Sequence, residues 1–141
     1  MTATISRPKI SNWETSNIPN LTGKTALITG ANSGLGYYTA KALAEKNAHV
    51  VIACRSLEKA NQTIKKLKGL NPEGIFTPLE LDLSDLKNVV EVQSKIFDDF
   101  ENLDLLINNA GIMHPPKTLS AQGYEIQFAV NHLAHMLLTL K

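Results

Sequence analysis

The chain of 141 residues has only one cysteine, Cys54. A single cysteine excludes an internal disulfide, so an apolar core has to stabilise the fold and a reducing compartment is expected. Because Cys54 ends an apolar run, we expect an inert buried thiol there and no nucleophile. The sequence also has no apolar run long enough to cross a membrane, and residues 1–20 have no apolar core of the signal-peptide type. These absences predict a cytoplasmic protein with no transmembrane segment.

The sequence also has little excess charge. Fourteen lysines and arginines face thirteen acidic residues, which leaves a net charge of +1. Such a balance gives no electrostatic reason to expect a nucleic-acid or membrane-surface partner. The length fits one domain. We therefore expect a soluble domain whose partner is a small molecule.

Strand-like and helix-like segments alternate along the chain, and this order predicts a parallel sheet with helices on its faces. Residues 1–20 form an expected extended arm, interrupted by Pro8 and Pro19, which Trp13 would pin to a domain spanning residues 21–141. The expected strands are 24–29, 49–53, 75–81 and 103–107; the expected helices are 35–46, 57–68, one after Ser84, and one from about 120–124 to 140.

Proline and apolar spacing refine this expectation. Pro78 cannot donate a hydrogen bond to a neighbouring strand, so the third strand should lie at a sheet edge. That position agrees with the strand order 3-2-1-4 of a doubly wound sheet. Ser84 is expected to cap the following helix. The residues of that helix expected to face the sheet are Leu86, Val89, Val90, Ile96, Phe97 and Phe100.

A glycine-rich run, Thr29-Gly30-Ala31-Asn32-Ser33-Gly34-Leu35-Gly36, lies between the first strand and the first helix. Glycine allows a sharp turn and a close approach of the backbone to a ligand. The free amides and the dipole at the start of a helix favour a bound anion. A structural turn is the alternative reading. The position between strand and helix favours a pyrophosphate site over that alternative.

The spacing of this run resembles the motif of the short-chain dehydrogenase/reductase family. Two further matches occur in the family's order: the segment 108–111 (Asn-Asn-Ala-Gly) directly after the fourth apolar run, and Asn131 in Val130-Asn131-His132. The resemblance is to the classical type, closest to the branch of retinol dehydrogenases and light-dependent protochlorophyllide reductases. It implies a Rossmann-type α/β fold and hydride transfer between NADP(H) and a carbonyl, an alcohol or a reducible C=C bond.

The end of the second strand bears on which cofactor is used. A carboxylate there would bind the adenosine ribose, whereas a basic residue would pair with the 2′-phosphate of NADP(H). The chain has Arg55 and Ser56, and no carboxylate, so we predict NADP(H). Arg55 would form the forked contact, with Ser56 or Asn32 as a further donor. A surface arginine without function is the alternative.

The resemblance implies roles for further residues. Asp82 and Leu83 match the family's adenine-contacting segment, although Asp82 could instead cap a helix. Asn108 is as consistent with a structural role as with binding. The full set of predicted cofactor-binding residues is Thr29, Gly30, Asn32, Ser33, Gly34, Leu35, Gly36, Arg55, Ser56, Asp82, Leu83, Asn108, Ala110 and Gly111.

Asn131 matches the family's catalytic asparagine, which helps to hold a water that supplies protons to the catalytic lysine. A buried amide within a helix needs hydrogen-bond partners, so a role is expected there. His132 and His135 lie three residues apart, but no third ligand with suitable spacing is present, and no metal site is predicted.

The family's catalytic tyrosine and lysine have the spacing Tyr-x-x-x-Lys, which occurs here only as Tyr37 to Lys41, on the wrong helix. We expect these two residues to be a packing residue and a surface residue. The family's serine and its true Tyr-x-x-x-Lys would follow a fifth strand, so the sequence reads as the first part of such a domain, truncated after the fourth strand and fourth helix. The alternative to an oxidoreductase is therefore an inactive cofactor-binding or interaction module. The fourth strand would then be exposed at an edge, open to self-association.

Overall fold

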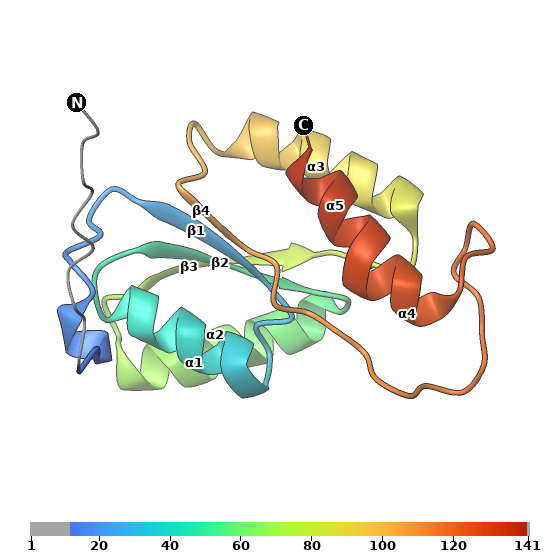
Figure 1. Cartoon of the computed structure of the whole chain (residues 1–141). Coiled ribbons are helices and arrows are strands. Elements are labelled where there is room, and N and C mark those ends of the chain that lie inside the picture. Colours follow the sequence, from blue (N-terminus) through green and yellow to red (C-terminus); the bar gives the residue numbers. More distant parts are fainter. Residues whose placement is uncertain (1–11, 141) are drawn as a thin grey trace, which may run out of the picture.

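A four-stranded parallel sheet with helices on both faces forms the centre of the molecule, as the computed structural model of residues 12–140 shows (Figure 1). The strand order is β3-β2-β1-β4, which confirms the Rossmann-type α/β prediction. The strands are β1 (Thr25–Thr29), β2 (His49–Cys54), β3 (Ile75–Glu80) and β4 (Leu105–Ile107). The helices are η1 (Thr15–Asn17), α1 (Gly34–Ala44), α2 (Leu57–Leu70), α3 (Leu86–Asp99), α4 (Ile126–Phe128), the π-helical η2 (Ala129–Leu133) and α5 (Ala134–Thr139).

The strand register aligns the carboxyl ends of the strands. β1 lies centrally, with Thr29 paired to Ala53 on β2 and Ile28 paired to Ile107 on β4. All pairings are parallel, so the loops that follow β1, β2 and β4 leave the sheet at the same edge. This edge is where open α/β sheets bind their ligands.

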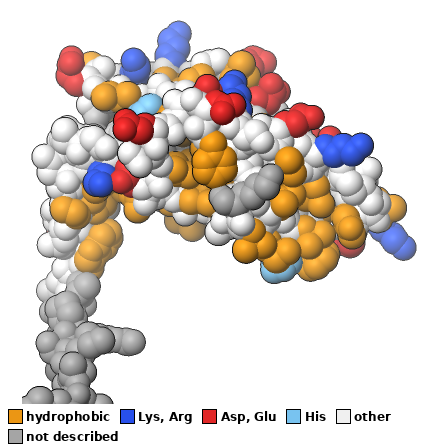
Figure 2. Space-filling view, turned by 90° about the horizontal axis from the view of Figure 1, so that it is seen from above, with side chains coloured by type: hydrophobic (Ala, Val, Ile, Leu, Met, Phe, Trp, Pro, Cys, Tyr) orange, Lys and Arg blue, Asp and Glu red, His pale blue; other side chains and the backbone are white. Residues whose placement is uncertain are grey.

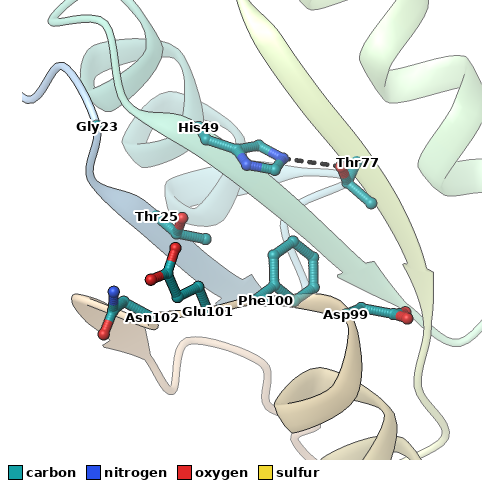
Figure 3. A pocket seen from close by; sticks show the side chains of 8 residues that line it. All are labelled: Gly23, Thr25, His49, Thr77, Asp99, Phe100, Glu101 and Asn102. Atoms are coloured by element: carbon teal, nitrogen blue, oxygen red, sulfur yellow. Dashed lines mark hydrogen bonds between the residues drawn. The ribbon is translucent and has the colours of Figure 1, made fainter.

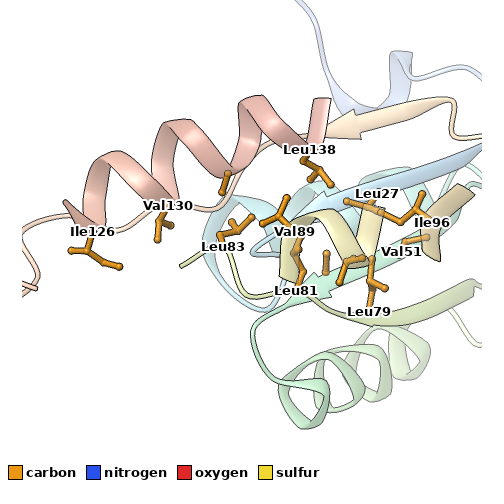
Figure 4. Packing of buried hydrophobic residues seen from close by; sticks show 13 residues of the cluster. Leu27, Val51, Leu79, Leu81, Leu83, Val89, Ile96, Ile126, Val130 and Leu138 are labelled. Atoms are coloured by element: carbon orange, nitrogen blue, oxygen red, sulfur yellow. The ribbon is translucent and has the colours of Figure 1, made fainter. Parts of the chain in front are cut away.

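Alternate residues of each strand point to opposite faces and build two separate cores. On one face, Leu27 and Val51 pack under α3 and α5 (Figure 4). On the other, Ile28 and Ile52 pack against α1 and α2. Each of these four residues is fully buried. Because β1 and β2 are covered on both faces, they read as continuous apolar runs.

Pro78 lies on β3 opposite Ile52, and β3 is an edge strand, as predicted. β4 forms the other edge among the described strands. Its first residue, Leu105, is 37% exposed, so β4 is less covered than its apolar sequence suggests.

The start and the inner face of α3 differ from the prediction. Asp85, and not Ser84, is the N-cap, because its side chain accepts from the Lys87 amide at 3.0 Å. Val90 and Phe97 are exposed, at 37% and 63%. The set of α3 residues predicted to face the sheet therefore included two that face solvent. Hydrophobic side chains are visible among the surface groups in Figure 2. The buried positions of α3 are Val89, Val92, Gln93 and Ile96.

The last helical segment begins later than expected and is not uniform. Glu125 caps it at Ile126 by accepting from the Gln127 and Phe128 amides. The preceding residues form a turn in which Leu119 bridges to Glu125, so they cannot join the helix. A π-helical stretch follows, where the Ala134 amide donates to the Ala129 carbonyl. In residues 12–140 no helix combines the length and the apolar character needed to cross a bilayer.

The arm of residues 1–20 is described only from residue 12, so Pro8 and most of the arm lie outside the described residues. Trp13 is 56% exposed and does not pin the arm as expected. Polar contacts attach the described part of the arm to the domain instead. Lys46 Nζ donates to the Ser16 carbonyl at 2.9 Å, and the Asn47 side chain donates to Asn20 Oδ1 at 3.1 Å.

Two adjacent valines test the orientation of α3. Val89 is fully buried, whereas Val90 is 37% exposed. Val89→Ala should lower the free energy of unfolding by about 2 kcal/mol through lost burial and a cavity. Val90→Ala should change it by less than about 0.5 kcal/mol. Urea unfolding of the two variants measures the difference, and equal losses would contradict this orientation of the helix.

Candidate nucleotide-binding site

The glycine loop between β1 and α1 is packed closely against the loop that follows β4. Gly30 has φ +66°, and a β-carbon placed on it would lie 2.9 Å from Ala110 Cα. A β-carbon on Gly36 would lie 2.5 Å from Asn109 Nδ2 and 2.6 Å from the Gly30 carbonyl oxygen. Gly34 has φ +55° and open space beside it. Glycine is therefore needed at Gly30 and Gly36 for close packing, and at Gly30 and Gly34 for backbone conformation.

Thr29 joins the two loops from beneath. It is 1% exposed, and its hydroxyl oxygen accepts from the Asn109 and Ala110 amides, each at 3.0 Å. Asn109 also donates from its side chain to the Thr29 carbonyl at 2.9 Å. His135 Nε2 lies 2.9 Å from the same hydroxyl oxygen. Thr29 is thus a scaffold residue of the site and does not line its surface.

A cavity of about 540 Å³ opens at the carboxyl ends of β1, β2 and β3. A smaller one of about 330 Å³ adjoins the glycine loop and includes Ser33 and Leu35. Together they are lined by nine of the predicted cofactor-binding residues, namely Gly30, Asn32, Ser33, Leu35, Arg55, Asp82, Leu83, Ala110 and Gly111. Thr29, Gly34, Gly36, Ser56 and Asn108 are not among the lining residues. Residues far apart in sequence therefore meet at one edge of the sheet.

The cavity also has a wall that the sequence did not indicate. Residues of the long segment after β4 and of the helix that follows it line its far side: Ile112, Pro115, Thr118, Leu119, Ile126 and Val130. These residues are apolar or small and match no short motif. Ile112, Pro115, Thr118 and Leu119 lie in the segment that follows residues 108–111, and that position is their one signal in the sequence. Ile126 and Val130 lie on the helical segment beyond it.

Arg55, which follows β2, lines the cavity, whereas the next residue, Ser56, caps α2. Arg55 is exposed and makes no ion pair within residues 12–140. Ser56 Oγ accepts from the Lys59 amide and so caps α2. Cys54 is 4% exposed, and burial raises the pKa of its thiol. A buried protonated thiol agrees with the inert cysteine expected from the sequence.

Asp82 shapes the turn after β3. Its Oδ1 accepts from the amide and the hydroxyl of Ser84, at 2.9 and 2.6 Å, and its own amide donates to Asn88 Oδ1. Leu83 is 7% exposed and belongs to the core as well as to the cavity wall. Asp82 therefore stabilises a turn and does not cap α3. Its contact with adenine stays a prediction.

The asparagines after β4 have mainly structural contacts. Asn108 Nδ2 donates to Thr139 Oγ1 at 3.0 Å, which attaches the segment to α5. Asn109 donates from its side chain to the Thr29 and Gly30 carbonyl oxygens at the end of β1, and so holds neighbouring strand ends together. Of the two alternatives for Asn108, its contacts are those of the structural role.

Asn131 is exposed and not buried as expected, yet its side chain bonds to both backbone groups of one residue, Ile112. Its Oδ1 accepts from the Ile112 amide and its Nδ2 donates to the Ile112 carbonyl, both at 2.8 Å. The π-helical stretch around Asn131 turns this amide toward the segment after Gly111. Its catalytic role stays a prediction.

Tyr37 and Lys41 lie on α1 in the packing and surface positions predicted for them. Tyr37 packs against the core beneath α1, and Lys41 pairs with Glu45 one turn later at 3.1 Å. His132 is exposed and stacks on Phe128, whereas His135 is buried. Within the described residues no three His, Cys, Asp or Glu side chains form a metal-binding group.

A second cavity of about 540 Å³ lies at the opposite end of the strands (Figure 3). His49 lines it and bonds through Nε2 to Thr77 Oγ1 at 2.8 Å, while Phe100 lies beside the ring. Partial burial lowers the pKa of His49. None of the predicted site residues lines this cavity, so we place the site at the carboxyl ends.

Comparison with known proteins agrees with this architecture. A family model described as short chain dehydrogenase matches residues 24–141. Human retinol dehydrogenase 13 is 43% identical over 117 residues, which cover 83% of this chain and 35% of that protein. Mouse retinol dehydrogenase 11 is 40% identical over 125 residues, 89% of this chain and 39% of that protein.

Solved structures match as well. A protein from Mycobacterium paratuberculosis has a TM-score of 0.79 and 39% identity, covering 90% of this chain and 44% of that one. A metagenomic short-chain oxidoreductase in complex with NADP has a TM-score of 0.72 and 27% identity, with coverages of 84% and 54%.

The chain belongs to the short-chain dehydrogenase family, in its retinol dehydrogenase-like branch. It spans between one third and two fifths of the length of these two curated relatives.

The close packing at Gly36 can be tested against a matched glycine. Gly36→Ala should lower the free energy of unfolding by about 1–3 kcal/mol, because its β-carbon collides with backbone and with Asn109. Gly69→Ala, on α2 with open space around it, should raise that free energy by about 0.5–1 kcal/mol. Denaturant unfolding gives both values. Similar effects of the two substitutions would show that the loops are not in contact.

Proposed function

We propose that this chain is the NADP(H)-binding part of an oxidoreductase that transfers hydride between the cofactor and a carbonyl, alcohol or reducible C=C group of a small molecule. The observation that carries the proposal is the arrangement at the carboxyl edge of the sheet. The glycine loop, Arg55 and the segment Ala110–Gly111 line adjoining cavities there.

The residues fit a dinucleotide in three respects. α1 begins at Gly34, which has open space beside it, and the amides and the dipole at this helix start favour a pyrophosphate. Asp82 and Leu83 lie on the wall next to the end of β2, where an adenosine would lie. Ala110 and Gly111 line the side toward β4, where small residues leave room for the second ribose and the nicotinamide. When bound, the nicotinamide supplies or accepts the hydride.

Arg55 favours NADP(H) over NAD(H). It lies on the cavity rim, exposed and without a described acidic partner, so its guanidinium is available to a phosphate. No carboxylate stands at Cys54, Arg55 or Ser56 to repel that phosphate. Both NADP-bound and NAD-bound oxidoreductases occur among the similar solved structures, so the proposed preference rests on Arg55.

The proton-transfer step of the family uses a tyrosine and a lysine four residues apart. The sequence has this spacing only at Tyr37 and Lys41, on α1 and away from the cavity. We therefore assign cofactor binding to these 141 residues and leave proton transfer outside them. A binding or interaction module without catalysis is the second candidate, supported by the same observation.

Arg55 provides the test of cofactor choice. Arg55→Asp should weaken NADPH binding about 10- to 100-fold, because a charged hydrogen bond is lost and a repulsion is added. Affinity for NADH should change less than about threefold. The NADPH affinity of Arg55→Lys should lie between those of the wild type and Arg55→Asp, because lysine keeps the positive charge but cannot donate two parallel hydrogen bonds to one phosphate. Titration calorimetry with both cofactors measures these constants.

Lys68→Asp is the matched control, because it makes the same charge change in the last turn of α2 and away from the cavity. It should leave the NADPH affinity nearly unchanged. If wild type binds NADPH and NADH equally, the role of Arg55 is wrong. If it binds neither, the proposed function is wrong.

We also propose that the edge of β4 pairs with a second copy of this chain when the 141 residues are alone in solution. The Asp104 amide donates to the Thr25 carbonyl on β1, so by alternation the Leu105 amide points away from β1. Beside this edge lies a cavity of about 360 Å³ lined by Leu103, Leu106 and Gln93, and Gln93 Oε1 is buried with no described partner. An unpaired amide row next to apolar surface is a template for strand pairing.

Sedimentation velocity at micromolar concentration should show dimers or larger species. Leu105→Pro removes the outward amide without touching the bond to β1 and should shift the chain toward monomer. Leu105→Ala keeps the amide and should not. A wild-type monomer, or equal behaviour of the two variants, would contradict edge pairing.

A further inference from the structure

A buried histidine lies directly beneath the candidate site. His135, on α5, is 6% exposed. Its Nε2 lies 2.9 Å from Thr29 Oγ1 and its Nδ1 lies 3.4 Å from the Asn131 carbonyl oxygen. The ring therefore contacts the first residue of the glycine motif and the backbone of the predicted catalytic asparagine. Neither the fold nor the proposed cofactor contacts account for an imidazole at this point.

The hydrogen bonds of Thr29 determine which ring nitrogen of His135 carries a hydrogen. A hydroxyl has one hydrogen to donate and two lone pairs to accept with. Both lone pairs are used, because the Asn109 and Ala110 amides each donate to Oγ1 at 3.0 Å. The hydroxyl hydrogen must then be donated. The acceptors in reach are His135 Nε2 at 2.9 Å and the Ile107 carbonyl at 3.5 Å.

We propose that His135 is a positioning residue of the site: neutral and protonated on Nδ1, it accepts the Thr29 hydroxyl hydrogen at Nε2. This contact orients both lone pairs of Thr29 toward the Asn109 and Ala110 amides and holds the segment 108–111 against the end of β1. The Nδ1 hydrogen points to the Asn131 carbonyl on the preceding turn. The imidazole thus bonds to Thr29 on β1 and to the helix that carries Asn131, and it reaches the segment after β4 only through Thr29.

Protonation of His135 would break this arrangement. An imidazolium presents a hydrogen on Nε2 to an oxygen whose lone pairs are both occupied, so one of the two amide bonds would have to be given up. The groups within hydrogen-bond reach of the two ring nitrogens are uncharged: the Thr29 hydroxyl on β1 and the Asn131 carbonyl on the preceding helical turn. Burial lowers the pKa of His135, which favours the neutral ring.

This inference deepens the proposed function, because it rests on that function for its effect on cofactor binding. Ala110 lines both cavities, and its amide is one of the two that Thr29 holds. A loosened segment 108–111 would cost NADPH affinity. The protonation state of the ring, by contrast, is measurable without cofactor.

Nitrogen-15 spectroscopy of the imidazoles provides the direct test on the whole 141-residue chain. There are four histidines, and substitution of His135 identifies its signals. We expect the Nδ1–H tautomer, with Nε2 as an unprotonated acceptor, at about pH 7. Observation of the Nε2–H tautomer or of an imidazolium at that pH would overturn the proposal, whether or not the chain binds NADPH.

Matched substitutions separate positioning from mere packing. His135→Gln can place its carboxamide oxygen where Nε2 lies, whereas the shorter His135→Asn reaches only the position of Nδ1. We expect His135→Gln and Thr29→Ser to keep NADPH affinity within about threefold of wild type. His135→Asn and Thr29→Val should lose roughly tenfold or more. Equal NADPH affinities of the His135→Gln and His135→Asn variants would contradict the contact.

The pH dependence of stability gives a second readout. The folded pKa of His135 lies below the usual value of about 6.5, so between the two values the unfolded chain binds more protons. Stability should therefore fall as the pH drops below about 6.5. His49, whose pKa is also lowered, contributes in the same direction, so the wild type is compared with His135→Gln. The variant should lose less stability on acidification. An identical pH dependence of stability in the wild type and His135→Gln would contradict the buried neutral ring.

If neither the wild type nor any variant binds NADPH, that result would count against the proposed function alone.

Discussion

The hydroxyl of Thr29 is the contact on which the candidate site depends. One oxygen atom, buried at the end of the central strand β1, accepts two backbone amides from the segment after β4 and lies within hydrogen-bond distance of His135 on α5. A buried polar group must be satisfied to avoid a large desolvation cost, and this one is satisfied by separate parts of the chain. The relative position of those parts is thereby restricted to a narrow range.

Backbone packing complements this polar contact. The glycine loop and the segment 108–111 approach so closely that a β-carbon at Gly30 or Gly36 would overlap the neighbouring loop. The absence of side chains at Gly30 and Gly36 lets the two loops touch, and Gly34, with open space beside it, begins α1. Glycines of one loop therefore serve both the fold and the proposed binding of a pyrophosphate.

The residues of the site divide into those that line the cavities and those that hold the lining in place. Arg55, Asp82 and Ala110 line the larger cavity, whereas Thr29 and Asn108 bond to neighbouring elements beneath it. Asn131 belongs to the second group in this structure, since its side chain bonds to the backbone amide and the carbonyl of Ile112. Residues of one family motif thus differ in role: those that line the cavity can contact a ligand, and those that do not line it hold the neighbouring elements in place.

The sequence alone determined the order of strands and helices, the edge position of β3 and the place of the glycine loop. Those features depend on local signals: apolar periodicity, the missing amide of Pro78, and glycine between a strand and a helix. The tertiary structure decided three features that local sequence signals do not specify: which residues of α3 are buried, where α3 begins, and which side chain contacts Thr29. Val90 and Phe97 have the spacing of buried residues but face outward, because only a narrow strip of α3 meets the sheet and α5. Asp85 replaced Ser84 as the cap, since where α3 starts depends on the preceding turn built by Asp82. The contact of His135 with Thr29 joins residues 106 positions apart, and no sequence spacing specifies it, because it exists only where the register of β1 and β4 places α5 over the end of the central strand.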